Sequence, residues 1–197
     1  MTKFLASFAL VVSILACLSA TIDQLLRPYG YTVAQTSLMG AFSVASGLVG
    51  ALTVGVIVDR TRQYLLVYRT LVVGCFVFSL PFLWTLPSGN VALLLPNIAL
   101  VFAVALPLVP LGVGLAVELA FPVSEAVSVG WLLFWSGAVA LGVTYLGSWL
   151  CQKDPMLEIV LFGILGLGAI TSTCFVKEEL NRLNRRQESD KDDDYII

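Results

Sequence analysis

Six long apolar stretches, separated by short polar links, make up most of this sequence. Each stretch is close to the ~20 residues that a helix needs to cross a bilayer. The stretches are continuous, whereas the strands of a membrane barrel would alternate apolar and polar residues over ~10 positions. We therefore predict an all-α membrane protein with six spanning helices, at Phe4–Leu25, Ser37–Val58, Leu65–Leu86, Val91–Val117, Ala126–Leu150 and Met156–Val176.

The links between the stretches carry residues that favour helix ends. Ser37 and Asn90 are suited to cap the second and fourth helices, and Asp154-Pro155 places a carboxylate at an N-cap and proline at the first helical position. We expect residues 1–176 to form one transmembrane domain. Residues 177–197 are predicted to form a polar, disordered cytoplasmic tail.

The first stretch has a second interpretation. Lys3, the apolar run and Leu18-Ser19-Ala20 resemble a secretory signal peptide with its cleavage site. The sequence leaves open whether this helix is cleaved or retained.

The basic residues are distributed unevenly between the two sides of the predicted bundle. Arg27 and Lys153 lie on one side. The other side holds Lys3, Arg60, Arg62, Arg69, Lys177, Arg182, Arg185, Arg186 and Lys191. Cationic loops stay in the cytoplasm, so both termini are expected there. Which membrane holds the protein, plasma or organelle, is left open.

Composition excludes several kinds of chemistry. The chain is 58% hydrophobic and 12% charged, about half the charged fraction of a soluble domain. It has no histidine, so Ser-His hydrolase triads and His-containing zinc sites are excluded. Its four cysteines form no CxxC pair. We expect no enzyme activity, no metal, no cofactor and no nucleic-acid partner; membrane lipid is the expected surrounding.

Two helices carry packing signals. In the second, small residues recur every four positions at Ser43, Gly47, Ala51 and Gly55, which allows a neighbouring helix to approach closely. In the fourth, Pro107 and Pro110 each remove a backbone donor and predict a kink. The freed carbonyls should be covered by protein or line a cavity.

Charged residues gather at the predicted cytoplasmic ends. Asp59, Arg60 and Arg62 follow the second helix, Glu118 ends the fourth and Glu125 begins the fifth. A carboxylate at a helix C-terminus is unfavourable unless it is paired. We predict a gating charge network among these five residues; a solvated ring of interfacial charges is the alternative.

Two motifs resemble a known transporter family. The first, between two spans, is Gly55-x-x-x-Asp59-Arg60-x-Arg62, which looks like the cytoplasmic loop motif of the major facilitator superfamily. The second runs Pro107-x-x-Pro110-Leu-Gly112-x-x-x-Ala116-Val-Glu118-Leu-Ala-Phe-Pro122-Val-x-Glu125-x-x-Ser128-x-Gly130. Together they resemble the C-terminal half of the feline leukaemia virus subgroup C receptor-related transporters, which include choline, ethanolamine and haem-linked carriers.

The resemblance implies helices seven to twelve of a twelve-helix carrier. Solute normally binds between the two halves of such a carrier. The expected partner is therefore a missing N-terminal six-helix half or a second copy of this chain in a homodimer. Where choline carriers of the family place an aromatic and a glutamine, this chain has Ala16 or Cys17 and Gly137, so choline itself does not follow.

The expected function is secondary active or facilitative transport of a small organic solute. Ser13, Asn97, Ser136 and Thr144 are the predicted path residues, although hydroxyls in membrane helices often bond their own backbone. The alternative is a non-transporting membrane fragment or a regulatory or assembly protein.

Overall fold

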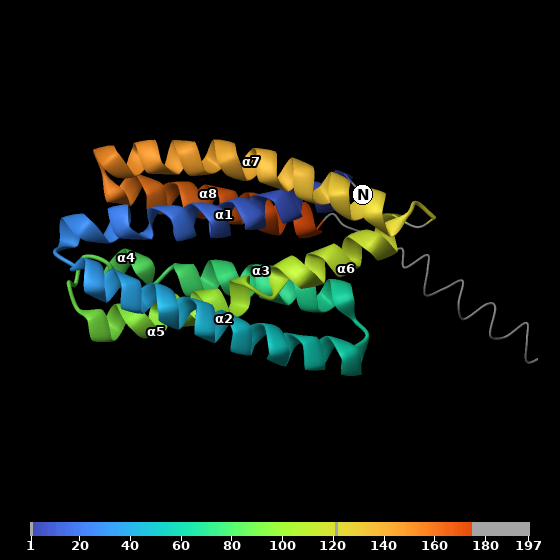
Figure 1. Ribbon diagram of the computed structural model, residues 1–197, viewed down its shortest axis with the longest axis horizontal. Helices are drawn as coiled ribbons and strands as arrows, with labels where there is room; N and C mark the ends of the chain where they lie inside the picture. Colours follow the sequence, from blue (N-terminus) through green and yellow to red (C-terminus); the bar gives the residue numbers. More distant parts are fainter. Residues whose placement is uncertain (1, 121, 175–197) are drawn as a thin grey trace, which may run out of the picture.

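The computed structural model describes residues 2–120 and 122–174; the predicted tail at 177–197 lies outside them. The described part is helical without a strand, and six of its helical segments are long and apolar enough to cross a membrane, which confirms the predicted fold class (Figure 1). The elements are α1 (Thr2–Leu26), η1 (Arg27–Tyr29), α2 (Val33–Thr61), α3 (Tyr64–Ser79), α4 (Phe82–Thr85), α5 (Val91–Ala105), α6 (Leu108–Ala120), α7 (Glu125–Lys153) and α8 (Pro155–Cys174).

The spans form two layers of three. α1, α7 and α8 lie side by side in one layer, and α2, α3 and α5 lie in the other (Figure 1). The start of α1 and the α2–α3 and α6–α7 links share one end of the bundle, which we call the arginine-rich end because it holds Arg60 and Arg62. η1 and the α7–α8 link lie at the opposite end.

Helix starts follow side-chain caps. The start predicted at Ser37 is wrong: α2 begins four residues earlier, where Thr32 and Gln35 form a reciprocal capping box. The caps predicted at Asn90 and Asp154 are confirmed, because Asn90 Oδ1 accepts from the Ala92 N–H and Asp154 Oδ1 from the Met156 N–H. Paired donors in these caps keep the helix starts satisfied near the bilayer surface.

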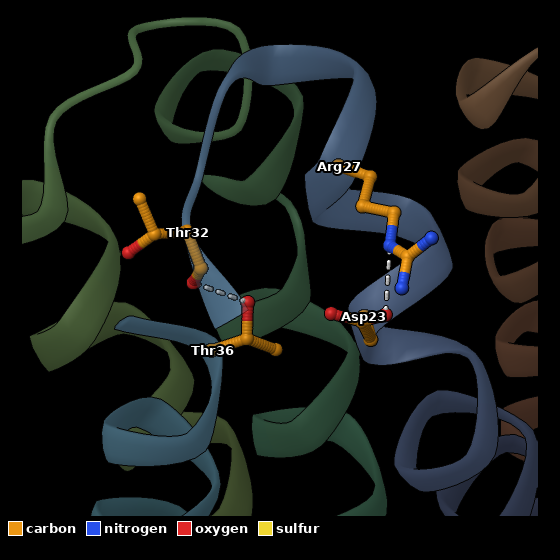
Figure 2. A network of polar contacts seen from close by, with 4 residues as sticks. All are labelled: Asp23, Arg27, Thr32 and Thr36. Carbon is orange, nitrogen blue, oxygen red and sulfur yellow. Dashed lines mark hydrogen bonds and ion pairs between the residues drawn. The ribbon is translucent and has the colours of Figure 1, made fainter. Parts of the chain in front are cut away.

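The α1–α2 link is held by short-range polar contacts. Figure 2 shows Arg27 turned back toward Asp23, with Nε 3.0 Å from Oδ2, one turn apart on the helix. It also shows the Thr36 hydroxyl donating to the Thr32 carbonyl at 3.2 Å. Gly30, at φ 81°, adopts the left-handed conformation that ends η1 and is inexpensive for glycine.

The third predicted span is broken at Pro81, which separates α3 from α4. The Asn97 side chain bridges this break. With its amide oxygen toward the Thr85 hydroxyl at 3.1 Å, the oxygen also accepts from the Phe82 N–H at 3.2 Å and the nitrogen donates to the Phe78 carbonyl at 3.0 Å. One buried amide thus satisfies two backbone groups that the broken helix leaves open.

The fourth span is broken between α5 and α6, at Leu106-Pro107. Pro107 has no N–H to give to the Ala103 carbonyl one turn earlier. That carbonyl faces Gly50 of α2, where even a β-carbon would overlap it. α2 therefore covers the freed carbonyl, and its closest contacts with α5 run through Gly47 and Gly50, whereas Gly55 faces open space.

α1 and α7 are in close contact through small residues. Ser13, Cys17 and Thr21, one turn apart on α1, are buried, as are Ser136, Ala140 and Gly147 on α7. A β-carbon added to Gly147 would overlap the sulfur of Cys17. In a membrane the hydrophobic effect does not drive helices together, because lipid tails are themselves apolar. Small side chains stabilise the contact by letting the two backbones pack closely.

Candidate functional site

Three of the four residues predicted to line a solute path bond groups of the bundle itself, and their role in a path stays a prediction. Ser13 and Ser136 are buried, and their hydroxyls donate to the Ala9 and Leu133 carbonyls of their own helices. Asn97 is used at the α3–α4 break, and Thr144 is half-buried on α7. The polar groups of Ser13, Asn97 and Ser136 therefore serve the bundle itself.

A cavity of about 310 Å³ lies between α1, α3, α5 and α8. Its wall is apolar, with Leu18, Phe76, Val101 and Phe162 among the lining residues. Ser79 also lines it, and its hydroxyl already donates to the Phe76 carbonyl at 2.7 Å. A charged or strongly polar solute would lose its hydration here without replacement partners.

A carboxyl group is buried near the end of the bundle that lies opposite the arginine-rich end. The sequence-based prediction of site residues did not include it. Glu158 lies in the first turn and a half of α8, and its side chain is 0% exposed. The signal in the sequence was a single carboxylate inside the sixth apolar stretch. Asp23, in the first stretch, carries the same signal, but its side chain is exposed and paired with Arg27. Helix packing, which the sequence does not show, therefore decides which of the two carboxylates is buried without a cation.

Two side chains of α1 and the backbone of Gly147 on α7 lie against Glu158. Thr21 Oγ1 forms a short hydrogen bond with Glu158 Oε1, and Cys17 Sγ lies within hydrogen-bonding distance of the same oxygen, at 3.5 Å. Gly147 of α7 lies against this group, since a β-carbon there would be 3.5 Å from Oε1. Oε2 is buried and forms no hydrogen bond with the residues that the structure describes. The α1, α7 and α8 helices therefore enclose one carboxyl group with one oxygen unused; we call it the Glu158 site.

The predicted charge network lies at the arginine-rich end. Asp59 and Arg60 are exposed in the last turn of α2, and Arg62 caps that helix at φ 53°. Glu118 is half-buried in α6, which runs on to Ala120, so it lies two residues before the helix end rather than at it. Glu125 is exposed in the first turn of α7.

Within the described residues of this single chain, no ion pair joins Asp59, Arg60, Arg62 and Glu118 to one another. Glu118 Oε2 is nevertheless buried without a hydrogen-bond partner. A half-buried carboxylate with an open oxygen at a helix C-terminus is unfavourable. The network therefore stays a prediction, and it needs either a rearrangement or another bundle to form.

The outer face of α7 is rich in exposed aromatic side chains. Trp131 and Trp135 meet edge to face, with ring centroids 5.8 Å apart, and Phe134 meets Trp135 at the same distance. Tyr145 lies further along the helix and is 79% exposed. Aromatic faces of this kind can bind cations, but here they point away from the bundle interior.

Comparison with known proteins places the fold. No family model matches the chain. Solute carrier family 49 member A3 of Danio rerio is 26% identical over 206 residues, covering 94% of this chain and 42% of the relative. The choline/ethanolamine transporter flvcr2a of Danio rerio is 31% identical over 157 residues, covering 77% and 32%. An uncharacterized MFS-type transporter of Caenorhabditis elegans, C09D4.1, is 23% identical over 179 residues, covering 89% and 30%.

The six spans and these matches together identify an integral multi-pass membrane protein related to transporters of the major facilitator superfamily. Within that superfamily, its relatives include solute carrier family 49 and the feline leukaemia virus subgroup C receptor-related group, and the resemblance seen in the sequence is confirmed. The chain spans less than half the length of each of these relatives.

Proposed function

We propose that this chain is one half of a secondary active or facilitative carrier for a small organic solute, with a second six-helix bundle supplying the other half. The relatives support transport as the general activity. In carriers of this superfamily the two halves are related by an axis along the membrane normal. A separate N-terminal half or a second copy of this chain could therefore complete the carrier.

One observation carries the need for a second bundle. Among the described residues, the polar side chains of Ser13, Ser136 and Asn97 form hydrogen bonds with backbone groups, and the cavity described above is apolar. A solute with polar groups needs a few precisely placed partners. Such partners are best supplied where two bundles meet. This chain would contribute the aromatic face of α7 and the arginine-rich end to that interface.

Orientation follows from the same proposal. The sequence predicts nine of the 11 lysine and arginine residues on one side of the spans, and on this proposal the arginine-rich end faces the cytoplasm. A charge network then holds the two bundles together on the cytoplasmic side, and it breaks when the bundles separate there. Its members are Asp59, Arg60, Arg62, Glu118 and Glu125.

Reconstitution tests the proposal. The chain is placed in lipid vesicles at increasing protein density, and uptake of labelled choline and ethanolamine, the solutes named for one relative, is measured first, followed by a wider panel of small organic solutes. Flux that rises with the square of density supports a homodimer; flux only on co-expression of an N-terminal half supports a two-chain carrier. No flux for any solute under either condition favours a non-transporting membrane protein.

A further inference from the structure

The Glu158 site is buried among apolar helices without a countercharge. Within the described residues, no lysine or arginine lies within ion-pair distance of Glu158. An ionised carboxylate removed from water without a cation costs several kcal/mol, because nothing replaces its hydration. The N-terminus of α8 favours negative charge, but only by a fraction of that cost.

The titratable and charged groups near the site offer no compensation. α1 presents the Cys17 thiol, and its Asp23–Arg27 pair is exposed and already satisfied. α7 presents the Cys151 thiol, which approaches the carboxyl group, while Lys153 lies 3.7 Å over the Trp149 ring. In the links, Tyr29 interacts with Asp154, and Asp154 accepts from the Met156 N–H; neither group adds a positive charge.

Counting protons indicates what the site holds. A hydroxyl carries one proton, yet Thr21 Oγ1 lies within bonding distance of two acceptors, the Cys17 carbonyl at 2.8 Å and Glu158 Oε1. The Cys17 thiol likewise has two, the Val143 carbonyl at 3.8 Å and Glu158 Oε1 at 3.5 Å. If both donate to the backbone, as hydroxyls in membrane helices usually do, the proton between Thr21 and Glu158 must belong to Glu158.

We propose that Glu158 is a proton-binding site built into the seam between α1, α7 and α8. The carboxyl group holds a proton while the seam is closed and gives it to water when α1 separates from α8. The proton leaves from the Glu158 O–H bond, and the product is a hydrated carboxylate. The proposal concerns proton binding alone and holds whether or not the chain carries a solute.

A proton fits this site better than a metal cation. Hard cations such as sodium and calcium prefer several oxygen ligands, whereas the side chains of this site offer only the two carboxyl oxygens and one hydroxyl beside two thiols. Among the described residues, no group of three or more acidic, cysteine or histidine side chains is arranged to hold a metal ion. A proton needs one oxygen.

Infrared spectroscopy of the full chain in phosphatidylcholine vesicles tests the proposal directly. The carbonyl stretch of a protonated carboxyl group should be present at neutral pH and disappear in Glu158→Gln. Glu118→Gln, which removes a half-buried carboxylate at the other end of the bundle, is the matched control and should keep the band. A band that survives Glu158→Gln, or a wild-type spectrum without the band at neutral pH, would overturn the proposal.

Two further measurements keep the test decisive if Glu158→Gln does not fold. Thr21→Val removes the hydrogen-bond partner of the carboxyl group, so the band should remain but shift in frequency; an unchanged band assigns it elsewhere and overturns the proposal. The second measurement is thermal stability at fixed pH with and without sodium. If sodium stabilised the wild type but not Thr21→Val, the site would bind sodium and not a proton, and the proposal would be overturned.

Discussion

Gly50 of α2 lies directly against the carbonyl of Ala103, the group that Pro107 deprives of its helical donor. The relationship joins two sequence features that look independent, a small residue in one span and a proline in another. Asn97 plays the corresponding role at Pro81 by bonding Phe78 and Phe82 across that break. Each break in a spanning helix is thus matched by a specific residue on a neighbouring helix, as backbone groups inside a bilayer require.

Gly50→Ala should destabilise the chain by about 1–3 kcal/mol, because its β-carbon would overlap the Ala103 backbone. Thermal unfolding in detergent, followed by tryptophan fluorescence, measures this. Gly40→Ala, in the same helix with open space around it, is the control and should be neutral or slightly stabilising. Equal melting temperatures for the two variants would contradict the proposed contact.

Gly147→Ala should destabilise the α1–α7 seam, because the new β-carbon would overlap Cys17 Sγ. Cys17→Ala removes that sulfur, so it should recover most of the loss in the double variant. A double-mutant cycle on melting temperature measures the coupling, and a coupling energy of about 1 kcal/mol or more is expected for residues in contact. Additive effects of the two substitutions would show that the helices do not meet at this pair.

Asn97→Leu should cost about 1–3 kcal/mol, because it leaves the Phe82 N–H and the Phe78 carbonyl without partners. Thr85→Val removes the hydroxyl that contacts Asn97 and donates to the Pro81 carbonyl at 3.0 Å, but it leaves both backbone contacts of Asn97 in place. It should cost less, about 0.6 kcal/mol, as is typical for hydrogen bonds in membrane bundles. If solute binding rather than stability changed in Asn97→Leu, the residue would belong to the solute path after all.

The charge network should appear only in an assembled carrier. In the chain alone, Arg60→Ala should leave the melting temperature unchanged, because Arg60 is exposed and forms no ion pair with another described residue. With a second bundle present, Arg60→Ala and Glu118→Gln should each lower flux several-fold, and the double variant should be no worse than either. Strictly additive losses in flux would count against a shared network.

The sequence predicts the spans well because bilayer thickness sets their length, so an apolar stretch cannot be much shorter or longer than its helix. It predicts Asn90 and Asp154 as caps because their contacts are local. The prediction of Ser37 as a cap is wrong because a better cap, Thr32 with Gln35, stands five residues earlier, in a stretch that looks like a link.

The Glu158 site could not be predicted in the same way. Its partners on α1 are 137 and 141 residues away in the chain, and they become visible only when α1, α7 and α8 are placed together. The prediction of path residues meets a related obstacle, because a hydroxyl in the sequence does not reveal whether a backbone carbonyl of its own helix already accepts its hydrogen bond. Ser13 and Ser136 do bond their own helices.

The layer of α1, α7 and α8 has a consequence for biosynthesis. Ser7 bonds Thr173 across 166 residues, and Cys17 meets Glu158 across 141. The ribosome therefore finishes α1 long before the helices that cover its polar face exist. During that interval the buried row of hydroxyl and thiol groups on α1 must be shielded by the insertion machinery or by another subunit, and substitutions that enlarge this row should reduce yield during synthesis before they affect the finished protein.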